Sequence, residues 1–173
     1  MGFSERIPAA YVDKLLVPAL VHLPGCEAVA GAFALSPANP FREGPESLLE
    51  LLNSAVRVVP FIRDSDDVVM LLARDAIDWV EVSRDVDPAW IHPESFVVTR
   101  EEEVQVRMIE GQELEGRVSM ELPEHLNRVS DFVNQLEDFF PLGAERGVLL
   151  INKSRLACLR LFEGSPPPVA EQA

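Results

Sequence analysis

Two stretches of this chain repeat one order of apolar and polar residues, and this internal similarity limits the fold more than any other feature. The segments "NSAVRVVPF" at 53–61 and "NQLEDFFPL" at 134–142 share an Asn, a Pro seven residues later and an apolar residue after it. With the same offset, the apolar positions of "ESLLELLN" at 46–53 fall on those of "NRVSDFVN" at 127–134. Since self-similarity in sequence indicates a recurring structural unit, we predict an internal duplication.

The similarity extends beyond these segments in both directions. After an insertion of two residues in the first copy, "VMLLARDAIDWVEV" at 69–82 aligns with "VLLINKSRLACLRL" at 148–161 without a gap. Upstream, each copy has an apolar run, a glycine turn and a second glycine. We predict an N-terminal unit at 1–83, which begins with a short helix, and a C-terminal unit at 103–162. A linker at 84–102 joins them, and a flexible tail follows at 163–173.

The second copy shows the local pattern most clearly. "EVQVRMIEG" alternates apolar and polar residues before Gly111, as a half-buried strand does. "ELEGRVSMEL" alternates in the same way, and Gly116 within it indicates a bulge or a sharp bend. Pro123 begins an amphipathic helix, and three short apolar strands follow, the last two joined by the turn "NKS". Each copy is therefore expected to contain two strands, a short helix and three further strands.

A small antiparallel sheet of five strands avoids exposed edges by bending into a barrel. The segments "EGQELEGRVSMEL", "SDFVN" and "LLINKSRLACLRL" resemble the strand pair, helix and last hairpin of Sm-like proteins, whose small barrel is SH3-like. Their pattern is also similar to that of an uncharacterised bacterial family. We therefore predict a mainly β protein of two tandem five-stranded Sm-like or SH3-like barrels related by internal duplication, and we expect 103–162 to fold alone.

The resemblance implies weak candidate positions for RNA binding. In Sm-like proteins that bind RNA, an Asp and an Asn follow the second strand, and the last hairpin contains Arg and Gly. Only Asp131, Asn134 and Asn152 could correspond here, and the turn "NKS" has no glycine. The formal charge of -14, from 15 Lys and Arg against 29 Asp and Glu, opposes phosphate groups. Direct nucleic-acid binding and binding to anionic membranes are therefore disfavoured.

No residue pattern predicts catalysis, a metal site or a cofactor. The histidines His22, His92 and His125 form no HxxH or HExxH cluster. Cys26 and Cys158 stand far apart and outside a CxxC motif, which predicts reduced thiols. Neither a Gly-rich phosphate loop nor a GxSxG elbow occurs. We therefore expect no catalytic, cofactor-binding or metal-binding residue and no enzyme activity.

The candidate interaction residues are Trp79 and Trp90, and the charged strip Glu101, Glu102 and Glu103. Aromatic side chains anchor interfaces, although core packing is the stronger interpretation of Trp79, and a charge run is commonly a solvated face. The high negative charge of the chain is commonly a feature that keeps a protein soluble. If the charge serves binding, a basic protein is the simplest partner.

Neither a signal-peptide pattern nor an apolar run of about 18 residues is present, which predicts a cytoplasmic protein. The leading hypothesis is a non-enzymatic adaptor or scaffold that binds another protein, with oligomerisation through strand edges left open. The alternative is a nucleic-acid-associated Sm-like regulator or an acidic mimic.

Overall fold

The protein is mainly β, with three short α-helices in the part of the chain that the structure describes. A computed structural model describes residues 13–93, 98, 100–120, 128–135 and 138–162. The predicted leading helix and the predicted tail at 163–173 fall largely or wholly outside these residues. None of the helices in the described ranges is long and apolar enough to cross a membrane.

Ten strands in the described part of the chain form two successive runs, which we call the first and the second half. The first half contains β1 (Leu15–His22), β2 (Val29–Leu35), α1 (Leu48–Leu52), β3 (Val58–Arg63), β4 (Val69–Ala73), β5 (Trp79–Ser83) and the short helix α2 (Pro88–Ile91). The second half contains β6 (Arg100–Met108), β7 (Glu113–Met120), α3 (Val129–Gln135), β8 (Phe139–Ala144), β9 (Gly147–Asn152) and β10 (Leu156–Leu161). The predicted order of two strands, a helix and three strands is confirmed in both halves.

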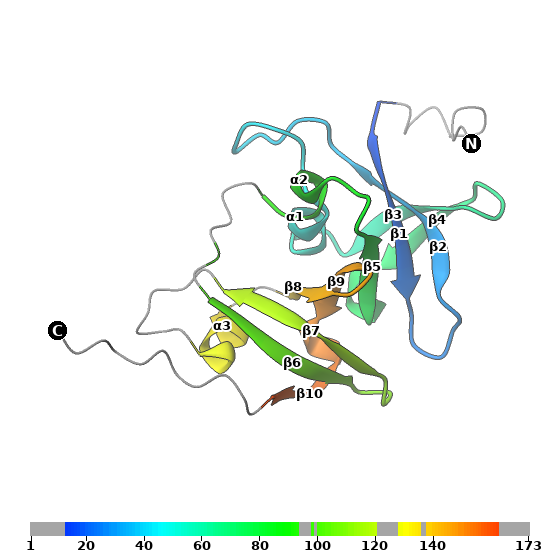
Figure 1. Cartoon of the computed structure of the whole chain (residues 1–173). Coiled ribbons are helices and arrows are strands. Elements are labelled where there is room, and N and C mark those ends of the chain that lie inside the picture. Colours follow the sequence, from blue (N-terminus) through cyan, green and yellow to red (C-terminus); the bar gives the residue numbers. More distant parts are fainter. Residues whose placement is uncertain (1–12, 94–97, 99, 121–127, 136–137, 163–173) are drawn as a thin grey trace.

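The strands belong to one open antiparallel sheet in the order β10-β6-β7-β8-β9-β5-β1-β2-β3-β4 (Figure 1). The order within the first half, β5-β1-β2-β3-β4, recurs in the second half as β10-β6-β7-β8-β9. The two runs meet where β5 pairs with β9, from Trp79 opposite Ile151 to Ser83 opposite Gly147. Strand pairing therefore joins the halves directly. The segment predicted as a linker instead contains α2 and the beginning of β6, which starts at Arg100.

The residues that first indicated a repetition occupy matching places in the two halves. Asn53 ends α1 and Asn134 lies near the end of α3, while Pro60 and Pro141 lie in β3 and β8. Neighbouring strands also keep the same register in both halves, apart from a shift between Leu156 and Cys158 where β10 begins to pair with β6. The two aligned segments therefore lie on equivalent elements of the two halves.

One glycine in each half allows neighbouring strands to approach closely. A Cβ atom at Gly116 of β7 would lie 2.3 Å from the carbonyl oxygen of Gly143, and one at Gly31 of β2 would lie 2.2 Å from that of Ile62. The β6–β7 register is continuous across Gly116, so the glycine permits a close approach and forms no bulge there.

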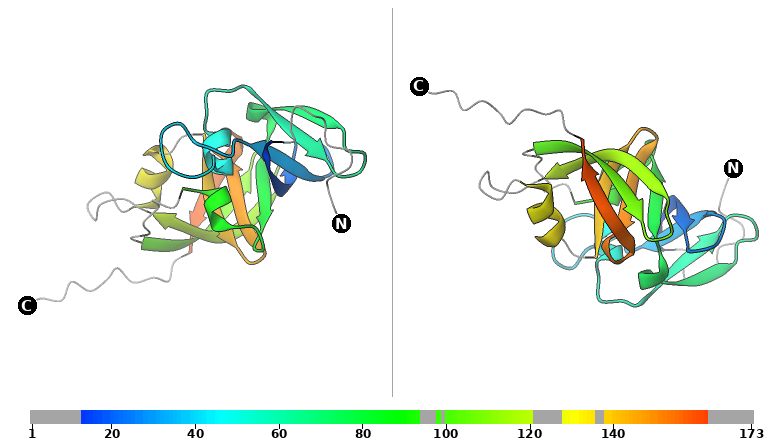
Figure 2. Two further views of the ribbon diagram at one scale, coloured as in Figure 1. Left: turned by 90° about the horizontal axis from the view of Figure 1, so that it is seen from above. Right: turned by 90° about the horizontal axis from the view of Figure 1, so that it is seen from below.

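The sheet separates two hydrophobic cores, and the strands at its centre contribute to both. The first core consists mainly of buried side chains from β1 to β5, α1 and α2, and the second core mainly of those from β6 to β9 and α3. Phe139 and Leu150 of the second half lie in the first core, whereas Trp79 of the first half lies in the second core. Successive side chains of a strand point to opposite faces, which explains this exchange. Figure 2 shows the strands of the two halves toward opposite ends of the molecule.

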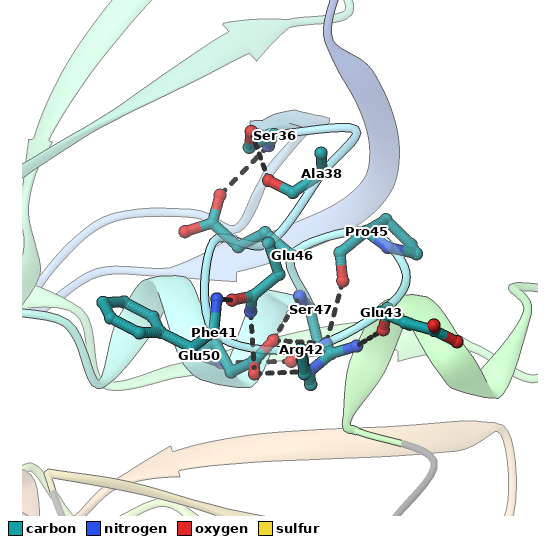
Figure 3. A network of polar contacts seen from close by, with 10 residues as sticks. Ser36, Ala38, Phe41, Arg42, Glu43, Pro45, Glu46, Ser47 and Glu50 are labelled. Atoms are coloured by element: carbon teal, nitrogen blue, oxygen red, sulfur yellow. Dashed lines mark hydrogen bonds and ion pairs between the residues drawn. The ribbon is translucent and has the colours of Figure 1, made fainter.

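The helix α1 is held by a network of polar contacts at its N-terminus (Figure 3). The Ser47 hydroxyl accepts a hydrogen bond from the Glu50 backbone N–H at 3.2 Å, and Glu50 Oε2 accepts one from the Ser47 N–H at 2.8 Å. Burial alone would raise the pKa of Glu50, but hydrogen bonds from Arg42 and Ser47 outweigh it and lower that pKa. This capping box fixes the start of the helix, whose Leu48 and Leu52 side chains are buried in the first core.

Candidate functional site

A groove of about 590 Å³ lies over β6, β7 and β8 beside the end of β10. Its position follows from strand alternation, because Val104 and Val106 face the second core while Glu101 and Glu103 point to the opposite side. The residues that line it are Glu101, Glu103, Glu115, Gly116, Arg117, Ser119, Gly143, Ala144, Glu145 and Phe162.

The groove is acidic, since its lining contains four carboxylates and one guanidinium. Arg117 is 3.2 Å from Glu103 and 3.9 Å from Glu101, and the Ser119 hydroxyl donates to Glu101 at 3.2 Å. The Arg117 side chain is 61% exposed, and exposed ion pairs contribute only about 0–1 kcal/mol. A second cation could therefore compete for these carboxylates at little cost.

Phe162 adds an apolar surface to one wall of the groove. It follows β10 directly, and it is 41% exposed although it is a large aromatic residue. Carboxylates beside an exposed aromatic ring are suited to bind a side chain with a cationic end and an apolar stem, such as that of Arg or Lys.

The first half has a smaller groove of about 330 Å³ in the corresponding place. Both grooves include the glycine of close strand approach, Gly31 in the first half and Gly116 in the second. The smaller groove has Asp64 and Glu81 in its lining, and Arg146 from the β8–β9 turn of the second half also lines it. The groove of the first half thus already contains a cation from the turn that precedes the neighbouring strand β9.

The structure places the predicted interaction residues in different environments. Glu101 and Glu103 lie in the groove, whereas Glu102 points to the other face, is 15% exposed and forms an ion pair with Arg100. Trp79 is 6% exposed within the second core, as the packing interpretation predicts.

Trp90 also lies away from the groove. It belongs to α2, is partly buried and packs against the first core.

The three Sm-like positions do not form one accessible polar site. Asp131 and Asn134 lie on α3, as predicted. Asn152 is 1% exposed, and its side-chain amide donates to the Ile77 carbonyl at 2.8 Å across the junction of the halves. The amide of Asn152 is therefore engaged in joining the halves.

Sequence reasoning missed Glu115, Arg117, Glu145 and Phe162. The first two could have been found, since they alternate with the apolar positions of the strand predicted at 113–122 and must lie on its outer face. Glu145 joins the groove only because β8 pairs with β7, and no local pattern contains that pairing.

A second polar feature lies near the middle of the sheet, where His22 of β1 stacks on Trp79 with ring centroids 4.1 Å apart. His22 Nε2 is 3.6 Å from Glu81 Oε2, which is slightly longer than a hydrogen bond. Burial lowers the pKa of His22 below 6.5, and the Glu81 carboxylate offsets part of that change.

We expect His22 to make the fold less stable in mild acid. Because its pKa is lower in the folded chain, the unfolded chain binds the proton first, so stability present above pH 6.5 is lost as the pH falls. Replacing His22→Phe keeps a ring on Trp79 and removes this titration. Thermal denaturation followed by circular dichroism, between about pH 7 and pH 5.5, should show a smaller fall in Tm for the variant than for the wild type. Equal falls would contradict the prediction.

Within the described ranges, no group of three or more His, Cys, Asp or Glu side chains is arranged to hold a metal ion. Comparison of the chain with models of protein families, with curated proteins and with solved structures found no match.

Proposed function

We propose that this protein is a non-enzymatic cytoplasmic adaptor that binds a basic segment of another protein in the acidic groove. The observation that carries this proposal is the lining of the groove, which contains four carboxylates, one exposed guanidinium and an exposed phenylalanine. Complementary charge directs a basic partner to this face and disfavours acidic ones.

We further propose that the two halves are copies of one duplicated Sm-like unit. The support is the same strand order and the same register in both halves. Each half has a groove at the corresponding place, and the two grooves differ in charge. Four carboxylates and Arg117 line the groove of the second half, whereas Asp64, Glu81 and Arg146 from the β8–β9 turn line that of the first half.

Binding of a fluorescently labelled peptide of about six arginines tests the proposal. We expect fluorescence anisotropy to show binding that weakens with added salt, because salt screens exposed charges. The double variant Glu101→Gln and Glu103→Gln should bind at least about tenfold more weakly, since two of the four groove carboxylates are removed.

The matched control is Glu27→Gln with Glu43→Gln, which changes the net charge equally at two exposed positions outside the groove. Equal weakening by both double variants would mean that overall charge, and not the groove, binds the peptide. A labelled single-stranded RNA is expected not to bind. If RNA bound more tightly than the arginine peptide, the adaptor would be wrong and the nucleic-acid alternative would replace it.

A further inference from the structure

The strand β10 ends the sheet, and its outer edge has no partner strand among the described residues. The Phe162 N–H donates to the Glu103 carbonyl of β6 at 3.4 Å. Because backbone groups alternate in direction along a strand, the N–H and C=O groups of Leu159 and Leu161 face the open edge. Leu161 is 53% exposed there. The edge thus offers both unpaired backbone groups and apolar side chains.

The other half shows what covers such an edge. On β5, Val82 occupies the position that Leu161 occupies on β10, and it is fully buried because β9 pairs beside it, with Val148 opposite Val82. From Cys158 on, β10 pairs with β6 in the same register in which β5 pairs with β1. The junction β5–β9 is therefore a template for a strand added to β10.

The template also shows which residues that added strand requires. In β9, Gly147 and Arg146 precede Val148 in sequence, and the Arg84 N–H donates to the Arg146 carbonyl at 3.1 Å. Arg146 then lines the groove of the first half. The same arrangement on β10 would bring a basic residue to the acidic groove of the second half.

We propose that the basic partner binds as an antiparallel strand on the free edge of β10 and places an Arg or Lys in the acidic groove. This inference rests on the proposed function and specifies the partner as a strand with the pattern basic, small, apolar, any residue, apolar. Main-chain hydrogen bonds supply affinity in such strand addition, and side-chain pockets supply specificity.

A second copy of this chain is the wrong occupant, although β4 is the other end of the sheet and its Leu71 is 69% exposed. The turn that precedes β4 contains Asp64, Asp66 and Asp67. If β4 were added to β10 as β9 is added to β5, this turn would bring those carboxylates to a groove that is already acidic. Like charges at an interface suppress that pairing, so the partner is a different, basic chain.

The test uses the full chain and a labelled synthetic peptide, RGVLLIN, which repeats residues 146–152. Since the Asn152 N–H donates to Asp78 across the β5–β9 junction, alternation makes the N–H groups of Val148 and Leu150 the ones that face the partner strand. A peptide methylated on either of these nitrogens should bind at least about tenfold more weakly. Methylation of the Leu149 nitrogen is the matched control and should change the affinity less than about threefold.

A protein variant gives a second readout. Leu161→Pro removes only an N–H that faces the open edge, a place where sheets accept proline, and should abolish peptide binding. Leu161→Ala keeps the N–H and should bind at least about tenfold more tightly than the proline variant.

The outcomes separate this inference from the proposed function. If all methylated peptides bind equally while the groove variant Glu101→Gln and Glu103→Gln still weakens binding, strand addition is wrong and the basic-segment adaptor stands. If neither RGVLLIN nor the arginine peptide binds, both proposals fall. Because the partner is a different protein, we expect the chain to be a monomer in analytical ultracentrifugation. Concentration-dependent oligomers that the variant Leu71→Lys abolishes would show instead that a second copy of the chain binds this edge.

Discussion

Residues 13–93 and 100–162, produced as separate polypeptides, are each expected to lack a cooperative unfolding transition, whereas the whole chain unfolds in one. The reason is the exchange of side chains between the cores. Separation removes Phe139 and Leu150 from the first core and Trp79 from the second. Loss of one large buried side chain costs about 2–5 kcal/mol, and a domain is stable by only about 5–15 kcal/mol.

Polar contacts across the junction add to this loss. The Asn53 side chain donates to the Phe139 carbonyl at 3.0 Å and accepts from the Phe139 N–H at 2.8 Å. Arg155 Nε lies 2.8 Å from the Asp78 carboxylate, which is 3% exposed. A separated half leaves these groups without their partners, and an unsatisfied buried polar group costs about 1–3 kcal/mol.

Thermal and urea denaturation monitored by circular dichroism would check the expectation. Mixing the two polypeptides should restore the β signal and the single transition, because the missing side chains and the β5–β9 pairing return together. A native-like transition in either polypeptide alone would contradict it, and would support the sequence-based expectation that 103–162 folds alone.

Gly147→Ala is expected to lower the free energy of unfolding by about 3 kcal/mol or more, although it adds one methyl group. The added Cβ would lie 2.0 Å from the Val82 carbonyl oxygen and 2.9 Å from the Arg84 nitrogen. Both are backbone atoms of the segment that pairs with β9, so neither can move without disturbing that pairing. The φ angle of +156° is a further cost, since residues with a side chain rarely adopt it.

The matched control is Gly143→Ala, four residues earlier in β8. There the nearest atom to an added Cβ is the Arg117 carbonyl oxygen at 3.6 Å, an ordinary contact. Urea denaturation should show a change of less than about 1 kcal/mol for this variant. Similar midpoints for the two variants would mean that the junction tolerates a shift of β9.

Sequence patterns predicted the elements of this fold well because those patterns are local. Strand alternation around Val104 and Val106, and the helical spacing of Leu48 and Leu52, depend only on near neighbours in the chain. The offset between Asn53 and Asn134 also aligned matching elements of the two halves, since the same local order of apolar residues occurs in both.

The connection between the copies could not be predicted in this way. The pairing of β5 with β9 joins residues far apart in sequence, so no local pattern indicated that Trp79 would enter the second core. Predicting two separate barrels assumed that each copy closes on itself, and the structure has one open sheet instead. The candidate site was found in part, because Glu101 and Glu103 lie on one strand while Glu145 reaches the groove through another.

The exchange of side chains between the cores also affects how this chain folds during synthesis. The first core contains Leu150, so the ribosome must add about 60 residues after α2 before that core can close. At about 5–20 residues per second this takes about 3–12 s. Throughout that interval the apolar side chains of β1 to β5 have no complete core to enter. We therefore expect these apolar side chains to stay accessible to solvent and to chaperones until β9 emerges.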